Sequence, residues 1–131
     1  MQIPEELLYH PEHTWARIEG DTAVVGITDH AQRQLGEIVY VEVPKPGRVL
    51  GFGEVFAYIE SSKSVPDPFS PVAGEVVEVN ETSLEDEPEV VNEDPYGGGW
   101  MIKVRVEAGF DTANLLDPGA YRAHLEKLEQ E

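Results

Sequence analysis

The chain has 131 residues, of which 40% are hydrophobic, and a formal net charge of −17 at pH 7. This length favours a single domain with a modest core, and the charge argues against nucleic-acid binding, because phosphates would repel it. The charge instead favours solubility, a monomer and partners with basic surfaces. The absence of cysteine excludes disulfides, thiolate metal sites and a cysteine nucleophile.

No stretch of the sequence approaches the roughly 20 apolar residues that a membrane helix requires. Residues 1–6 (MQIPEE) contain neither the basic region nor the apolar run of a secretory signal. We therefore expect a cytoplasmic protein without a membrane segment.

Short runs in which apolar and polar residues alternate, separated by glycine and proline, predict a mainly β chain. The first two runs are joined by a tight turn at Gly20 and Asp21. The predicted strands cover residues 14–19, 22–27, 38–43, 54–60, 74–80 and 100–106. In the strand over 54–60, alternation assigns Val55, Ala57 and Ile59 to the core face.

Two segments carry helix signals. Thr28 can act as an N-cap and Gly36 can end a helix, so we predict a short internal helix between them. Asp117, followed by proline, predicts the start of an amphipathic C-terminal helix that covers about residues 117–130 and packs on the sheet. The acidic segment 81–92 is weakly patterned, and we predict a long loop with one helical turn.

Lys63 is the most unusual residue of the chain. It is the only lysine or arginine between Arg48 and Lys103, an interval that contains twelve acidic residues. The residues before it predict a strand and those after it a returning strand, which places the lysine at an exposed hairpin tip. Pro66 and Pro68 both lack an N–H group, so the returning strand is expected to be an edge.

An exposed lysine is protonated at neutral pH and is a poor nucleophile. Its chemical use therefore has to come from a modification or from docking. The hairpin pattern alone still favours the alternative of an ordinary surface lysine.

Other candidate sites are weak. His10 and His13 have the spacing of a metal-binding fragment, but no cysteine completes it and the acidic residues nearby are not at ligand spacing. Residues 85–87 (EDE) lack the pattern of a calcium loop. The sequence has no Gly-x-Ser-x-Gly motif and no glycine-rich phosphate loop before a helix. We therefore expect neither a metal site nor an enzyme.

Long motifs around Lys63 resemble a known family. Residues 60–64 (ESSKS) and 70–80 (SPVAGEVVEVN) are similar to the lipoylation segment of the glycine cleavage system H-protein family. Three further segments resemble other parts of the same family: residues 25–32 (VGITDHAQ), 35–44 (LGEIVYVEVP) and 91–101 (VNEDPYGGGWM). The resemblance extends over roughly residues 9–128.

The resemblance implies one lipoyl-carrier domain over residues 1–131, with the barrel-sandwich hybrid fold of lipoyl and biotinyl domains. It implies that Lys63 carries lipoate through an amide bond. The implied function is a non-catalytic carrier that shuttles the aminomethyl group of glycine. Its implied partners are glycine decarboxylase (P-protein), aminomethyltransferase (T-protein), dihydrolipoamide dehydrogenase (L-protein) and a lipoyl ligase.

The resemblance also implies contacts between the chain and the lipoyl arm. Asp67 and Gln34 are the implied cleft residues, and Glu60 retains the family's acidic position before the lysine. The family usually has a glutamate between the histidine and tryptophan near the N-terminus, where this chain has Thr14. Glu12 can substitute for it, since a spacing of two keeps the same face of a strand.

A second departure lies beside the lysine, where Ser62 and Ser64 replace the valine and alanine usual in the family. Several alternatives stay open. A biotin carrier domain usually has methionines around its lysine, and a lipoyl domain of a 2-oxo acid dehydrogenase usually has Asp-Lys-Ala; this chain has neither. The others are an H-like paralogue that serves lipoate transfer or sulfur metabolism, and an unmodified binding protein.

Overall fold

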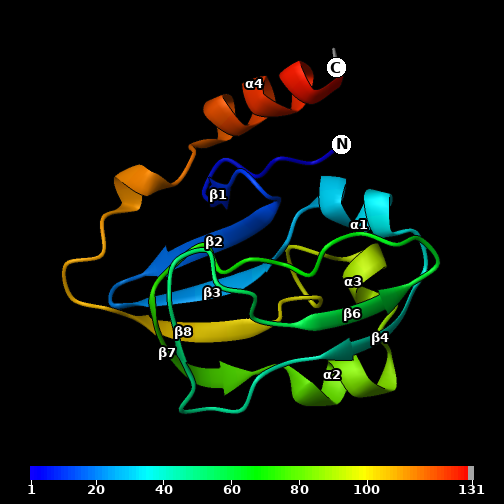
Figure 1. Ribbon diagram of the computed structural model, residues 1–131, viewed down its shortest axis with the longest axis horizontal. Coiled ribbons are helices and arrows are strands. Elements are labelled where there is room, and N and C mark those ends of the chain that lie inside the picture. Colours follow the sequence, from blue (N-terminus) through cyan, green and yellow to red (C-terminus); the bar gives the residue numbers. More distant parts are fainter. Residues whose placement is uncertain (130–131) are drawn as a thin grey trace.

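The computed structural model describes residues 1–129, which form a six-stranded and a two-stranded antiparallel sheet (Figure 1). The larger sheet has the order β1 (Leu8–His10), β2 (Thr14–Glu19), β3 (Thr22–Ile27), β8 (Ile102–Val106), β7 (Gly74–Val79), β5 (Val49–Leu50). The smaller sheet pairs β4 (Ile38–Glu42) with β6 (Tyr58–Ser61). The prediction of a mainly β chain is confirmed.

Most predicted strands are present where alternation placed them. The strands predicted over 14–19 and 22–27 coincide with β2 and β3, and Gly20 turns between them with a φ of 65°. In β8, Ile102 and Val104 are buried while Arg105 is exposed. The alternation of side chains across a strand therefore located the core correctly in the larger sheet.

The predicted strand over 54–60 is wrong in its first half. Within this segment, regular strand pairing begins only at Tyr58, the first residue of β6. Val55 is 40% exposed whereas Phe56 is 1% exposed. The backbone N–H of Phe56 donates to the carbonyl of Pro68 (3.1 Å), and Val55 forms an isolated bridge with Phe69. This local pairing breaks the alternation and places the larger aromatic ring in the core.

The internal helix is α1 (Asp29–Leu35). The Thr28 Oγ1 accepts a hydrogen bond from the N–H of Ala31 (3.2 Å), and Gly36 ends the helix with a φ of 71°. Both features are the ones from which this helix was predicted.

The C-terminal helix is α4 (Pro118–Glu129), and Gln130, the last residue predicted for it, lies outside the described residues. Asp117 caps it by accepting from the N–H of Ala120 (2.7 Å). The ring of Tyr121 stacks on that of Tyr9 in β1, with centroids 4.5 Å apart and planes 4° apart. Figure 1 shows α4 beyond β1, at the edge of the larger sheet.

The acidic segment 81–92 is more helical than predicted. It contains α2 (Glu81–Asp86) and the start of α3 (Val90–Glu93), and a 3-10 helix η1 (Thr112–Asn114) follows β8. Leu84 and Val91 anchor α2 and α3 because both side chains are buried in the core. So few apolar anchors give no recognisable period among so many acidic residues.

Among residues 1–129, no helix has both the length and the hydrophobicity that are needed to cross a bilayer.

Gly74 lies where the chain enters β7, against the backbone of β8. A Cβ atom at this position would overlap the carbonyl oxygen of Arg105. We expect Gly74→Ala to lower the free energy of unfolding by about 3 kcal/mol, because neither backbone can move without breaking the ladder. Denaturant unfolding measures this loss.

Gly51→Ala is the matched control, since its Cβ would meet only the Glu54 Oε1, at 3.8 Å. We expect a change of less than about 0.5 kcal/mol for this surface position. Equal effects of the two substitutions would contradict the close approach at Gly74.

Candidate functional site

The backbone around Lys63 is anchored while its side chain is exposed. The N–H of Lys63 donates to the carbonyl of Leu35 (3.1 Å), and that of Ser62 donates to the carbonyl of Glu37 (2.9 Å). The Ser62 Oγ also accepts from the N–H of Glu37 (3.0 Å), a bond that a valine could not form. The lysine is therefore presented from a loop that is held against the end of α1.

The predicted return strand after the lysine is not formed. Residues 64–68 have no strand structure, and Pro66 and Pro68 supply no N–H group to a ladder. Lys63 therefore occupies a loop that follows β6 rather than the tip of a regular hairpin.

Behind this loop lies a cleft with a volume of about 80 Å³. Its wall brings together three polar residues predicted from the sequence: Glu12 before β2, Gln34 in α1 and Asp67 in the segment after Lys63. The remaining wall is largely apolar and includes Ile27, Leu35, Ile59, Val65 and Phe69. A small group that carries a positive charge would meet two carboxylates and an amide on a surface that is otherwise largely apolar.

Lys63 and Glu60 lie outside the cleft, in an open groove that adjoins it. This groove, which we call the Lys63 groove, shares Ile59, Val65 and Asp67 with the cleft. The Glu60 carboxylate accepts a hydrogen bond from the Tyr58 hydroxyl (2.9 Å), and neither of these residues lines the cleft. Asp67 therefore stands at the border between the lysine and the cleft.

Thr14 is fully buried, and its hydroxyl donates to the carbonyl of Phe69 (2.8 Å). This bond connects β2 to the segment that carries Asp67. The threonine therefore stabilises the wall of the cleft but does not line it. Glu12 is exposed beside it and lines the cleft. The structure thus places a carboxylate at the cleft despite the threonine.

His13 also lines the cleft, and its role there was missed from the sequence. Its Nδ1 lies 2.9 Å from the Tyr121 hydroxyl. The His13 ring is 4.3 Å from that of His30 and 6.0 Å from that of His124, measured between centroids. The spacing of His10 and His13 had suggested only a metal fragment, because the histidines of α1 and α4 are distant in the sequence.

His13 and His30 are held in the neutral form. Burial, together with the nearby His30, lowers the pKa of His13 to about 4, and burial also lowers the pKa of His30. Within residues 1–129, no group of three or more histidine, aspartate or glutamate side chains is arranged to hold a metal ion.

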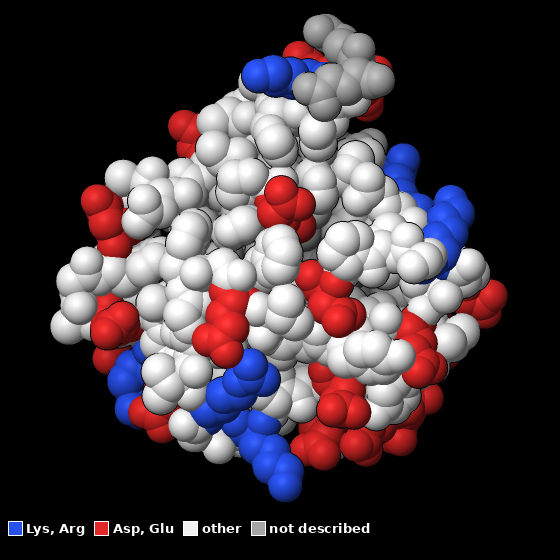
Figure 2. Space-filling model, viewed as in Figure 1, with Lys and Arg blue, Asp and Glu red and all other residues white. Residues whose placement is uncertain are grey.

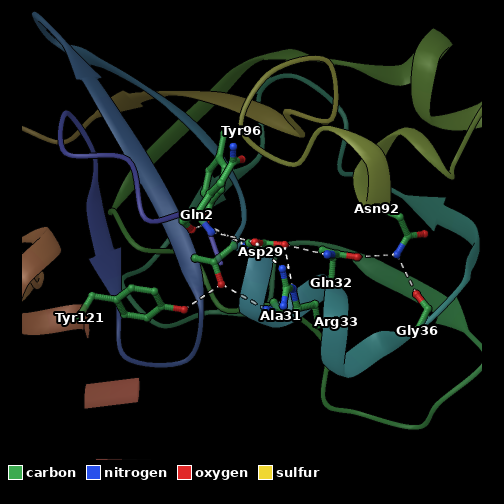
Figure 3. Close-up of polar contacts among 10 residues, drawn as sticks. Gln2, Asp29, Ala31, Gln32, Arg33, Gly36, Asn92, Tyr96 and Tyr121 are labelled. Atoms are coloured by element: carbon green, nitrogen blue, oxygen red, sulfur yellow. Dashed lines mark hydrogen bonds and ion pairs between the residues drawn. The ribbon is translucent and has the colours of Figure 1, made fainter. Parts of the chain in front are cut away.

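A network of polar contacts holds α1, and hence Gln34, in place (Figure 3). The Asn92 amide group donates to the Gln32 side chain (3.0 Å) and to the carbonyl of Gly36 (2.8 Å). Its oxygen accepts from the N–H of Ile38 (3.0 Å). One side chain therefore fixes the end of α1 and the start of β4.

Asp29 anchors the other end of α1 (Figure 3). Burial alone raises its pKa, but hydrogen bonds from the Gln2 backbone and the Gln32 side chain and the charge of Arg33 together hold the pKa below its ordinary value. The N–H of Asp29 also donates to the Tyr96 hydroxyl (2.8 Å). The first turn of α1 is thus bonded to the N-terminal segment and to the loop before β8.

Comparison with known proteins agrees with this geometry. Residues 7–128 match the family model described as Glycine cleavage H-protein. The chain belongs to the glycine cleavage H-protein family. A protein from Rubrobacter xylanophilus named glycine cleavage system H protein is 55% identical over 128 residues, which are 98% of each chain. One from Thermus thermophilus with the same name is 51% identical over 126 residues, covering 96% of this chain and 98% of that one.

A solved structure supports the family assignment at the level of the fold. The crystal structure of a glycine cleavage system H protein from Mycobacterium marinum has a TM-score of 0.84 and 35% sequence identity, covering 95% of this chain and 99% of that chain. The predicted fold class, a barrel-sandwich hybrid with a short internal helix and a C-terminal helix, is confirmed.

The neutral state of His13 predicts a pH dependence of stability. Folding lowers the pKa of His13 from the ordinary value of 6.5 to about 4. Between pH 4 and 6.5 this residue therefore binds more protons in the unfolded chain than in the folded one. The contribution of the neutral ring is complete above pH 6.5 and is lost as the pH falls toward 4. We expect a loss of about 1–3 kcal/mol from this residue between pH 7.5 and 4.5.

Denaturant unfolding of the wild type and His13→Asn across this pH range tests the expectation. Asparagine tolerates the left-handed backbone of this position, where φ is 74°. The difference in stability between the two proteins should shrink as the pH falls. Parallel pH profiles would contradict a depressed pKa at His13.

Proposed function

We propose that the chain is a lipoyl carrier of the glycine cleavage system, with lipoate attached to Lys63. The main support for this proposal is the position of the lysine. Its side chain is exposed, its backbone is bonded to the end of α1, and it borders a cleft that contains carboxylates. Membership of the glycine cleavage H-protein family supports the same role.

The attachment would be an amide bond between the lipoyl carboxyl carbon and the Lys63 Nζ, formed by a lipoyl ligase with net loss of water. The amide removes the positive charge of Lys63, so the modified protein is one unit more negative. When bound, lipoate supplies a disulfide that takes up and releases the one-carbon amine derived from glycine. The exposed Lys63 and the adjoining Lys63 groove give room for such an arm.

The cleft would then receive the amine that the arm carries. A primary amine is protonated at neutral pH, so Glu12 and Asp67 attract it and Gln34 can accept a hydrogen bond from it. The apolar remainder of the wall excludes water from the cargo, which slows its hydrolysis. No group of the carrier has to act as a nucleophile or a base for this shelter to work.

In this proposal the carrier occupies a single domain over residues 1–131 and works as a monomer in the cytoplasm. Glycine decarboxylase loads it, the aminomethyltransferase unloads it, and dihydrolipoamide dehydrogenase reoxidises the dithiol. The carrier itself catalyses none of these reactions.

The attachment is tested by intact mass spectrometry after incubation with lipoyl ligase, ATP and lipoate. The wild type should gain one lipoyl increment, and Lys63→Arg should gain none although its fold is retained. Lys103→Arg is the matched control, because it makes the same change at a lysine of β8 and should be modified normally. A wild-type protein that stays unmodified would falsify the proposal.

The role of the cleft is tested with the loaded carrier. Glu12→Gln and Asp67→Asn each remove one carboxylate from the amine, so we expect loss of the aminomethyl group to be about 2- to 10-fold faster than in the wild type, the range for partly exposed ion pairs. Glu126→Gln removes a charge from an exposed position of α4 and should have no effect. Unchanged loss rates in both cleft variants would exclude this role.

Glycine–bicarbonate exchange with glycine decarboxylase separates the carrier from a paralogue that serves only lipoate transfer. The lipoylated wild type should support exchange. A protein that is lipoylated but inactive in this assay would favour the paralogue.

A further inference from the structure

The outer face of the small sheet carries two tyrosines and two glutamates in a square. The register pairs Tyr40 with Glu60 and Glu42 with Tyr58. The Tyr40 hydroxyl donates to Glu42 and the Tyr58 hydroxyl to Glu60, both at 2.9 Å. We call these four side chains the Tyr–Glu face.

Both aromatic rings of the Tyr–Glu face are open to solvent. Tyr40 is 42% and Tyr58 45% exposed, and their rings meet edge to face with centroids 6.2 Å apart. A register shift between Ile38 and Tyr40 leaves Val39 exposed as well. Tyrosine is enriched in protein interfaces, and these rings are already oriented by their hydrogen bonds, so little side-chain entropy is lost on contact.

The Tyr–Glu face carries two carboxylates, and Lys45, Arg48 and Lys63 lie in the grooves at its border. The hydrogen bond to Glu42 raises the pKa of Tyr40, and Glu60 and Glu85 raise it further. Within residues 1–129, no ion pair formed by a lysine or an arginine involves Glu42 or Glu60. Figure 2 shows acidic side chains gathered over the region of β4, β6 and α2.

The Tyr–Glu face continues directly into the Lys63 groove. Val39, Tyr58 and Glu60 belong to the lining of that groove together with Lys63 itself. An enzyme that receives the lysine arm in its active site therefore comes close to this face. Aromatic rings flanked by carboxylates match arginine better than lysine, because a planar guanidinium stacks on a ring while it donates to a carboxylate.

We propose that the Tyr–Glu face is the docking surface for the enzyme that loads the arm, and that this enzyme presents arginine side chains to it. The inference rests on the proposed carrier function and adds the recognition element that the function requires. In this arrangement each guanidinium lies against one tyrosine ring and donates to the neighbouring glutamate.

The test uses lipoylated full-length protein as the substrate of glycine decarboxylase. Two double variants, Tyr40→Ser with Tyr58→Ser and Glu42→Gln with Glu60→Gln, remove the rings or the charges. The matched control, Glu107→Gln with Glu126→Gln, removes the same charge from exposed positions outside this face. All the substituted residues are exposed, and equal melting temperatures establish that the fold is intact.

Each double variant of the Tyr–Glu face should raise the KM for the carrier about 10-fold with kcat unchanged, because docking is weakened while the chemistry is not. The glutamate variant should also reduce the dependence of KM on salt, and the control should behave as the wild type. Wild-type KM values in both face variants would overturn the docking proposal. A wild-type carrier that is lipoylated but is no substrate would instead overturn the carrier function, and the docking proposal with it.

Discussion

The hydrogen bonds between the end of α1 and the loop of Lys63 are the constraint on which the rest of the site depends. They join the N–H groups of Ser62 and Lys63 to the carbonyls of Glu37 and Leu35. Because α1 also carries Gln34, the lysine and one wall of the cleft are parts of the same rigid unit. An exposed lysine on a free loop would sample many directions, whereas this one leaves the surface from a fixed origin beside the cleft.

Local patterns were sufficient for much of the fold. Strands β2 and β3 and the caps at Thr28 and Asp117 depend on neighbouring residues, so the sequence predicted them closely. Val55 was misassigned because its environment is decided by a pairing with Phe69 that alternation does not reveal. The helices of the acidic segment were missed for a related reason, since Leu84 and Val91 become anchors only when the core surrounds them.

The site residues also differ in whether the sequence alone could identify them. Lys63 stood out because of its isolation among acidic residues, and Asp67, Gln34 and Glu12 were reached through the family resemblance. The structure brings the last three to one cleft although they come from separate parts of the chain. The departures from the family are accommodated by geometry: the hydroxyl at Ser62 gains a backbone partner, and that at Thr14 donates to the carbonyl of Phe69 in the wall of the cleft.

The hydroxyl of Tyr121 lies within hydrogen-bonding distance of both His13 and Thr28, which are 108 and 93 residues away in the sequence. During synthesis on the ribosome, His13, which lines the cleft, therefore lacks this partner until residue 121 has emerged. The lysine, by contrast, emerges near the middle of translation. The chain thus releases Lys63 from the ribosome well before the contacts of Tyr121 with His13 and Thr28 can form, so these two parts of the site are completed in a fixed order.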